Sequence, residues 1–160
     1  SNGAIKAVTA IKDLCLVTVE GTGMVGVPGI AARTFGAVAS SDVSVLLISQ
    51  ASSEQSICFS VPNGASDAVI ASLTAEFDSE LDRRDIDSIW AMRDVSIVTI
   101  VGAGMRGTPG ISGRVFSSLG NNLVNVIAIA QGSSECSISI VVAAEDTGSA
   151  VAHIHEIIAS

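Results

Sequence analysis

The chain repeats itself once, at a fixed spacing of 81 residues. Residues 14–61 align with residues 95–142 without a gap, and 21 of the 48 aligned positions are identical. Solenoid repeats have periods of roughly 20 to 50 residues, so a longer period indicates that each copy is a small domain. The chain of 160 residues therefore predicts two related domains.

The residue pattern within one copy predicts its secondary structure. Apolar, β-branched runs indicate strands, and apolar residues at helical spacing indicate helices. The expected elements are a strand over 14–20, a helix from Pro28 to Ser40, strands over 43–49 and 56–61, a helix over 67–81 capped by Ser66, and a strand over 86–92. Residues 50–55 are too few for a crossover helix, so the second and third strands form a hairpin. The order βαββαβ predicts an α+β, ferredoxin-like unit with two helices on one antiparallel sheet.

The second copy ends with its second helix, over 147–158, and lacks a fourth strand. The strand-like segment 4–11, at the other end of the chain, has no partner in the first copy. We expect this segment to complete the second sheet, so that the first unit (13–93) is nested in the second (4–12 plus 94–160). The alternative is that residues 4–11 are a frayed leader and that the missing strand lay beyond the last residue.

Composition excludes several classes of protein. The chain is 48% hydrophobic with a mean hydropathy of +0.58, which excludes wholesale disorder. A charged fraction of 15% is low and predicts apolar surface covered by a partner. A net charge of −8 and an aromatic fraction of 3% argue against nucleic-acid and membrane partners. Three well-spaced cysteines, Cys15, Cys58 and Cys136, predict free thiols in a reducing compartment, hence the cytoplasm, or the plastid of a plant.

A glycine-rich loop follows the first strand of each copy, as GTGMVG at 21–26 and GAGMRG at 102–107. The pattern GxGxxG is that of dinucleotide-binding folds, which need a parallel second strand. The predicted hairpin excludes that reading. Two alternatives remain: the loop N–H groups and the following helix N-terminus bind a small carboxylate, or the glycines only form a tight turn.

The remaining polar residues predict no catalytic and no metal site. Gln50 and Gln131 end equivalent strands, where an amide either binds a ligand or caps its own hairpin. Glu54 and Glu135 are expected to be solvated, and Arg33 and Arg114 to cover helix faces. His153 and His155 lie two residues apart on one helix, so they point to different faces and are expected to lie at the surface. No cysteine has metal-ligand spacing.

The two glycine loops, together with VLLISQASSEQSICFSVP and VIAIAQGSSECSISIVV, resemble the paired ACT domains of aspartate kinase. The resemblance covers residues 4–158. It is closest to the bifunctional aspartokinase–homoserine dehydrogenases that respond to threonine.

The resemblance implies effector-binding residues at the interface between ACT units. Gln50 and Gln131, each with an isoleucine two residues earlier (Ile48 and Ile129), resemble the threonine-binding residues of the family. Backbone at Gly23, Met24, Gly104 and Met105 matches the segment that meets the effector's carboxylate. Asn125, expected to open the second strand of the second unit, matches a position that often contacts effector, and Ser44 is its counterpart. Leu46 stands where lysine-regulated kinases carry an aspartate, which favours threonine because lysine's ammonium would be left unpaired.

The resemblance further implies that this chain regulates and does not catalyse. A kinase domain that uses ATP and Mg would precede it, and a fused dehydrogenase would use NAD(P); the chain itself needs no cofactor. The implied partners are an amino-acid effector, a second copy that pairs through the ACT sheets, and the kinase domain. The alternatives are a structural dimerisation module with no working effector site, and a module that responds to another amino acid such as lysine.

Overall fold

The computed structural model describes residues 7–24, 27–50, 55–102, 110–131 and 137–159, with only the backbone at Gln50, Gln131 and Ala159. The chain divides into two compact units. One consists of residues 13–94, and the other joins residues 1–12 to residues 95–160. We call them unit 13–94 and unit 95–160. None of the helices within the described ranges is long and apolar enough to cross a membrane.

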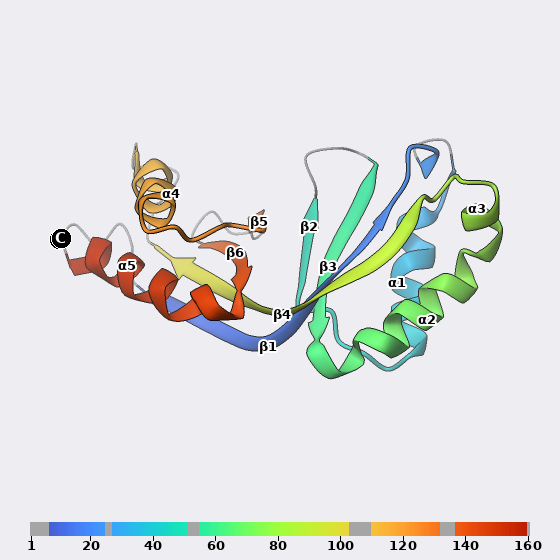
Figure 1. Ribbon diagram of the computed structural model, residues 1–160, viewed down its shortest axis with the longest axis horizontal. Helices are drawn as coiled ribbons and strands as arrows, with labels where there is room; N and C mark the ends of the chain where they lie inside the picture. The colour runs from blue at the N-terminus through green and yellow to red at the C-terminus, as the bar shows by residue number, and fades with distance from the viewer. Residues whose placement is uncertain (1–6, 25–26, 51–54, 103–109, 132–136, 160) are drawn as a thin grey trace. The chain divides into compact units, whose positions relative to one another are not determined.

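Unit 13–94 has the predicted βαββαβ order. Its strands are β1 (Ala7–Glu20, from residue 13 onward), β2 (Leu47–Gln50), β3 (Ser56–Pro62) and the first half of β4 (Ser88–Val101), and its helices are α1 (Ile30–Ser40), α2 (Ser66–Glu76) and α3 (Asp78–Asp82). The strands lie in the order β2-β3-β1-β4, and β3 pairs antiparallel with both β1 and β2. In the right half of Figure 1, α1 and α2 lie on the same side of these strands. The predicted α+β fold is confirmed.

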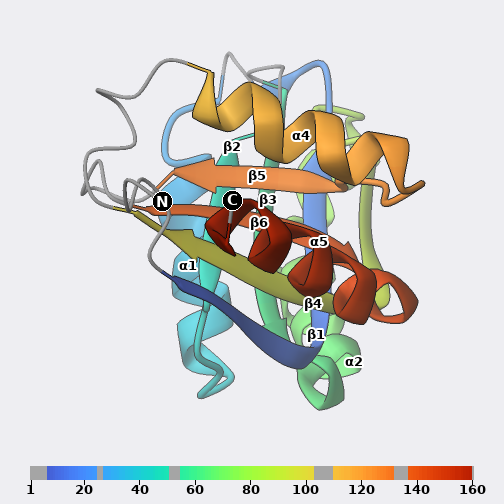
Figure 2. The same cartoon turned by 90° about the vertical axis from the view of Figure 1, so that its left-hand side faces the viewer.

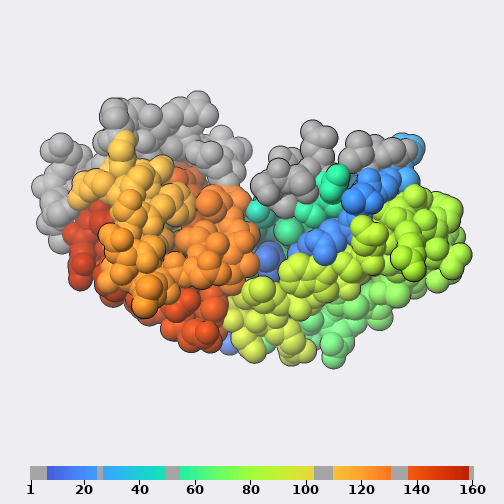
Figure 3. Space-filling model, turned by 45° about the horizontal axis from the view of Figure 1, so that its top comes forward, coloured from blue at the N-terminus to red at the C-terminus, as the bar shows by residue number. Residues whose placement is uncertain are grey.

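Unit 95–160 repeats this arrangement with residues 7–12 as its fourth strand. Its other elements are the second half of β4, α4 (Ile111–Asn121), β5 (Ala128–Gln131), β6 (Ser137–Ala143) and α5 (Thr147–Ala159). The strands lie in the order β1-β4-β6-β5. Figure 2 shows α4 and α5 in front of this sheet. The outer face of α4 lies at the surface (Figure 3), where residues 112–114 are exposed.

The structure extends the repeat to the long strands. Strands β1 and β4 begin 81 residues apart and end 81 residues apart, and each runs from one unit into the other. Where it passes from one unit into the other, each strand carries an aspartate with positive φ, namely Asp13 at 60° and Asp94 at 57°. Aspartate tolerates this left-handed conformation better than most residues. The segment predicted over 4–11 and the strand predicted over 14–20 therefore belong to one continuous strand over the described residues.

Five local predictions were wrong at their boundaries. The strand predicted over 86–92 begins at Ser88 and continues to Val101 as β4. Helix α1 begins at Ile30, because Gly29 precedes it as a left-handed N-cap with φ of 79°, so Pro28 lies in the preceding turn. Strand β2 begins only at Leu47; residues 43–46 form no strand, and Val43 and Val45 pack against the core instead. The predicted helix over 67–81 is broken at Phe77, where the backbone leaves the helical conformation (φ −102°, ψ 25°), so the segment forms α2 and α3. Ser66 does not cap α2, because a 3-10 turn over residues 63–65 leads directly into the helix.

Each unit has its own apolar core between its sheet and its helices. The core of unit 13–94 gathers the inward residues of β1 and β3 with those of α1 and α2, including Val17, Phe59, Val38 and Leu73. Phe35 meets Phe59 edge-on at 5.4 Å between ring centroids. The core of unit 95–160 repeats the pattern with Val98, Ile140, Leu119 and Ile154. Burial of these side chains is the main term that holds each unit together.

Polar contacts also repeat between the two units. The Thr18 hydroxyl lies 3.4 Å from the Cys58 sulfur, and Thr99 and Ser139 make the equivalent contact at 2.9 Å. The buried Thr147 hydroxyl donates to Ser96 at 2.8 Å. Ser66 and Cys15 occupy the equivalent positions; burial raises the pKa of the Cys15 thiol, and the hydrogen bond with Ser66 opposes the rise. The Cys15 side chain is fully buried and belongs to the core of unit 13–94.

Candidate functional site

The loop after β1 in unit 13–94 contains two glycines that no larger residue could replace. A Cβ atom at Gly21 would lie 2.3 Å from the Asp85 carbonyl oxygen and 2.6 Å from the Ile86 Cα atom. A Cβ atom at Gly23 would lie 2.6 Å from the Asp85 Cα atom. Among the described glycines only Gly29 and Gly110 have positive φ, so Gly21 and Gly23 are required by close packing against the segment 85–87.

Most of the N–H groups of this loop already have acceptors. Gly21 donates to the Gln55 carbonyl oxygen at 2.9 Å, Thr22 to a carboxylate oxygen of Asp87 at 3.2 Å, and Met24 to the Gly21 carbonyl at 3.2 Å. Within the described part of the chain, the Gly23 N–H has no hydrogen-bond acceptor. An incoming carboxylate would therefore find its donor at Gly23, or would have to displace Asp87 from Thr22.

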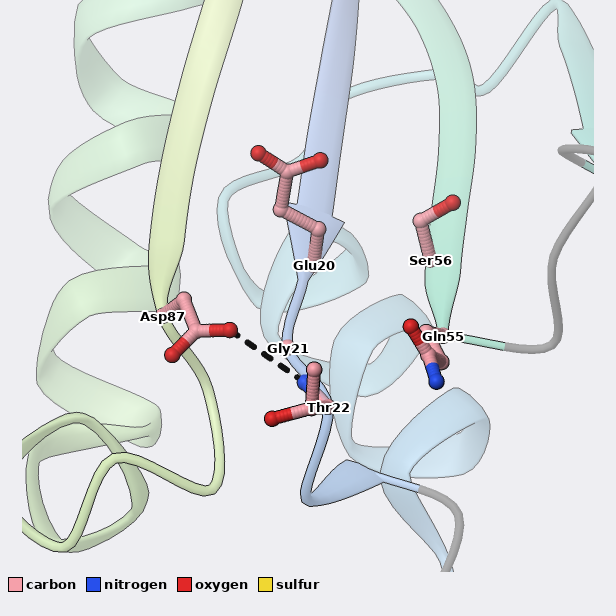
Figure 4. Close-up of a pocket in the computed structure, with 6 residues that line it drawn as sticks. All are labelled: Glu20, Gly21, Thr22, Gln55, Ser56 and Asp87. Atoms are coloured by element: carbon pink, nitrogen blue, oxygen red, sulfur yellow. Dashed lines mark hydrogen bonds between the residues drawn. The ribbon is translucent and has the colours of Figure 1, made fainter.

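A shallow pocket of about 150 Å³ opens beside this loop. It is lined by the end of β1, the start of β3 and the residue before β4, namely Glu20, Gly21, Thr22, Gln55, Ser56 and Asp87. Figure 4 shows Asp87 directed toward the Thr22 N–H, with Gln55 and Ser56 on the opposite wall. Two carboxylates among six lining residues make this pocket suited to a hydrogen-bond donor or a cation, and unsuited to a further carboxylate.

The Glu20 carboxylate is held by two donors from β4. The Ser88 hydroxyl donates to Glu20 Oε1 at 3.0 Å and the Trp90 indole N–H at 3.1 Å. The Asp87 N–H donates to the Glu20 carbonyl oxygen at 2.8 Å. The mouth of the pocket is therefore a hydrogen-bonded junction between the end of β1 and the start of β4.

The two glutamines end the short strands β2 and β5. Gln50 pairs with Ile57, and Gln131 pairs with Ile138. Their side chains lie outside the described structure, so ligand contact and hairpin capping both stay predictions. Ile48 and Ile129 are 54% and 49% exposed, an unusual surface position for such apolar side chains.

The other predicted site residues are spread over loop, core and surface. The Met24 side chain is 6% exposed and joins the core, so only its backbone faces the loop. Asn125 is exposed but precedes β5, which begins at Ala128, so the prediction that it opens a strand was wrong. The side chain of Leu46 is exposed, and its N–H donates to Ser60. Gly104, Met105, Glu54, Glu135 and Cys136 lie outside the described residues.

Arg33 does more than cover a helix face, which corrects the sequence-based expectation. From α1 it donates to Glu80 twice, at 2.7 and 3.2 Å, and to Glu76 through Nε at 2.9 Å. Its guanidinium carbon lies 4.8 Å from the centre of the Phe77 ring. Hydrogen bonds from Arg33 lower the pKa of Glu80, although burial opposes this, and the side chain of Glu80 is 7% exposed.

Neither of the two histidines lines the pocket. His153 is half-buried and its Nδ1 lies 2.7 Å from the Ser149 carbonyl, whereas His155 is exposed. The expectation that both are surface residues is therefore confirmed only for His155. The residues that the structure describes contain no group of three His, Cys, Asp or Glu side chains able to hold a metal ion.

Both copies of the repeat match one protein family. Residues 17–77 and 98–157 each match the ACT domain family. The chain belongs to the ACT domain family. The antiparallel pairing of β2 with β3 agrees with this assignment and excludes a dinucleotide-binding unit in residues 13–94, because that fold requires a parallel second strand.

The tandem of ACT units also matches part of larger curated proteins. It is 43% identical over 151 residues to the bifunctional aspartokinase/homoserine dehydrogenase, chloroplastic, of Daucus carota. It is 40% identical over 152 residues to the bifunctional aspartokinase/homoserine dehydrogenase of Haemophilus influenzae. The matches cover 94% and 95% of this chain but only 16% and 19% of those proteins, so the chain spans less than a fifth of their length.

Among solved structures, the tandem resembles the ligand-free regulatory subunit of aspartate kinase from Thermus thermophilus. The TM-score is 0.76 at 25% identity, and the match covers 96% of this chain and 97% of that one. The regulatory subunit from Thermus flavus matches with a TM-score of 0.80, also at 25% identity, over 96% and 97% of the two chains. The resemblance to the regulatory region of aspartate kinase that the sequence motifs predicted is confirmed.

Sequence reasoning missed Asp87, Gln55 and the role of Arg33. Asp87 belongs to no motif, and its only signal is the acidic pair at 85 and 87 at the start of the strand predicted over 86–92. Gln55 contributes its carbonyl oxygen, a group that no sequence pattern marks. Arg33 lies 47 residues from Glu80, and nothing in the spacing predicts that their helices pack together.

Proposed function

We propose that this chain is the amino-acid-sensing regulatory region of an aspartokinase of the bifunctional aspartokinase/homoserine dehydrogenase type, and that its effector is L-threonine. The observation that carries the proposal is the match of both ACT units, at 40–43% identity, to a region of two such enzymes. Kinase and dehydrogenase activity, with ATP, Mg and NAD(P), would belong to segments outside these residues. Its cellular location would follow that of the parent enzyme.

In the proposed site, threonine contacts the glycine loop of an ACT unit. Its carboxylate accepts a hydrogen bond from the Gly23 N–H, where the loop has a donor to offer. Repulsion from Glu20 and Asp87 keeps the carboxylate out of the pocket, and the same charges attract the ammonium group. The hydroxyl meets the amide of Gln50 or Gln131, which can donate as well as accept.

Threonine inhibits the parent enzyme if it binds the inactive arrangement more tightly than the active one. Coupling energies of this kind are about 1 to 3 kcal/mol, and two sites in one chain allow separate signals to two activities. A second copy that pairs through the ACT sheets would transmit the signal between subunits.

Calorimetric titration with threonine, with lysine as the control ligand, tests the proposal. We expect saturable heat with threonine alone, and weaker binding in the Gln50→Ala and Gln131→Ala variants without loss of folding. Each variant should reduce the stoichiometry or the affinity of one site. Unchanged affinity in both variants would refute the site assignment. Saturable heat with lysine and none with threonine would assign lysine as the effector.

The exposed isoleucines on β2 and β5 favour a second candidate, a structural module that only dimerises. Ile48 and Ile129 are about half exposed on short strands at the sheet edges. A thermal-shift panel of the amino acids separates the two functions. An effector that binds the folded state raises the melting temperature by mass action, whereas a purely structural module responds to none of them.

A further inference from the structure

We propose that Arg33 is a positioning residue for residues 21–24, here called the effector loop, in unit 13–94. The inference rests on the proposed function for the role of that loop, but its geometry stands on the structure alone. Arg33 does not line the pocket and would not touch the ligand. It acts through the segment against which the loop is packed.

The first step runs from α1 to α3. Arg33 forms a two-pronged hydrogen bond with the Glu80 carboxylate, and its Nη2 also donates to the Glu76 carbonyl oxygen at 2.9 Å. With the Nε bond to the Glu76 carboxylate, the guanidinium makes four hydrogen bonds to the end of α2 and to α3. Charge-assisted, two-pronged contacts of this kind fix geometry as well as adding energy. Arg33 therefore fixes where α3 lies relative to α1.

The second step runs from α3 to the segment 85–87. The Glu80 carbonyl oxygen accepts the N–H groups of both Asp85, at 2.9 Å, and Ile86, at 3.1 Å. The side chain of Ile86 is fully buried in the core, which anchors the same turn from below. Glu80 therefore links the two contacts: its carboxylate accepts from Arg33, and its carbonyl oxygen positions the turn at 85–86.

The third step returns to the effector loop. Asp85 and Ile86 pack so tightly on Gly21 and Gly23 that no Cβ atom fits between them. Asp87 accepts the Thr22 N–H, and its own N–H donates to Glu20. The described contacts therefore form a chain that runs from Arg33 through Glu80 and the segment 85–87 to the effector loop, so a shift of α3 is passed to the loop.

The repeat differs at one position of this chain of contacts. Arg114 occupies the position on α4 that is equivalent to Arg33, but Ile157 stands where unit 13–94 has Glu76. An isoleucine has no carboxylate to accept from a guanidinium. Substitution of Arg33 should therefore act on one of the two units, which makes the effect separable from a general loss of stability.

Amide hydrogen exchange on the ligand-free chain tests the proposal directly. Arg33→Met keeps the aliphatic stem and removes the guanidinium. Arg33→Lys keeps the charge and loses the two-pronged contact. Val61→Ala is the matched control, because Val61 lies in β3, outside the chain of contacts from Arg33 to the effector loop, and its truncation destabilises the same core. We expect exchange at Thr22 and Met24 to rise by about tenfold or more in Arg33→Met, the factor expected when a charge-assisted hydrogen bond is lost from a local opening.

Three results decide the matter. Selective acceleration at the loop in Arg33→Met, a smaller one in Arg33→Lys and a uniform rise across the unit in Val61→Ala support the proposal. A uniform rise in Arg33→Met, or an unchanged loop, overturns it. A threonine titration of the same variants should then show weaker binding in Arg33→Met than in Val61→Ala. If the unaltered chain binds no threonine, the proposed function fails while the exchange result still decides the role of Arg33.

Discussion

Replacing Gly21 by alanine should destabilise unit 13–94 strongly, although the change adds only one methyl group. The new Cβ atom would lie 2.3 Å from the Asp85 carbonyl oxygen, 2.6 Å from the Ile86 Cα atom and 2.8 Å from the Asp87 nitrogen. All three neighbours are backbone atoms, so no side-chain rotation relieves the clash. The segment 85–87 has to move away by roughly 1 Å before these contacts become ordinary van der Waals contacts.

The size of the effect follows from what that movement breaks. Overpacking of this kind costs about 1 to 3 kcal/mol. The displacement also lengthens the 2.8 Å bond from the Asp87 N–H to Glu20 and the 3.2 Å bond from Thr22 to Asp87. Each lost bond adds about 1 kcal/mol, and the lower chain entropy of alanine in the unfolded state offsets about 0.4 to 1 kcal/mol. We expect a net loss of about 3 kcal/mol in the free energy of unfolding.

The single tryptophan makes the measurement specific to one unit. Trp90 is the only tryptophan, the chain has no tyrosine, and the indole donates to Glu20 beside the mutated residue. Urea unfolding followed by Trp90 fluorescence therefore reports on unit 13–94. Gly36→Ala is the control: it lies on α1 with open space around its Cβ position, and should raise stability by up to about 1 kcal/mol. A Gly21→Ala protein within about 0.5 kcal/mol of the unaltered chain would refute the packing argument.

Two further substitutions test separate features. Leu123 lies two residues after the end of α4, with φ of 60°, and is 89% exposed. The N–H groups of Val124 and Leu123 donate to the carbonyl oxygens of Leu119 and Gly120, respectively. Leu123→Gly should raise stability by about 1 kcal/mol in thermal unfolding, because glycine accepts that conformation without strain, and Leu123→Ala should show no such gain. Hydrogen bonding from Arg33 lowers the pKa of Glu80 in the folded state. The ionised carboxylate therefore stabilises the folded state above the ordinary glutamate pKa near 4.3, and this stabilisation is lost as the pH falls through the lowered pKa of the folded state. In urea titrations at pH 7 and pH 3, Glu80→Gln should lose less stability on acidification than the unaltered chain; an equal loss would contradict this linkage.

The order of the elements could be predicted because two copies of the same pattern supported each other. Strand and helix types follow from apolar spacing, which local residues determine. The boundaries failed where packing overrides that spacing. The helix breaks at Phe77 although the apolar pattern continues, and the Phe77 ring is fully buried in the core. Val43 and Val45 are apolar enough for a strand, but they contact the core from an irregular segment.

The candidate site could be predicted in its location but not in its contacts. The glycine pattern marks the loop at 21–26, and the structure places a pocket beside it. The pattern cannot distinguish glycines that admit a ligand from glycines that admit another part of the chain. At Gly21 and Gly23 that other part is the segment 85–87, more than 60 residues later in the sequence.

The sequence by itself determined that this protein is a tandem of two α+β units with equivalent glycine loops, because the 81-residue repeat keeps 21 of 48 aligned residues identical without a gap. Only the tertiary structure decided which charges meet. Arg33 and Arg114 are indistinguishable in the repeat, yet the partners of Arg33, Glu76 and Glu80, come from helices that pack beside α1. Local patterns record the periodicity of one element, whereas the contacts between elements depend on how their faces pack, and that is settled only when the core closes.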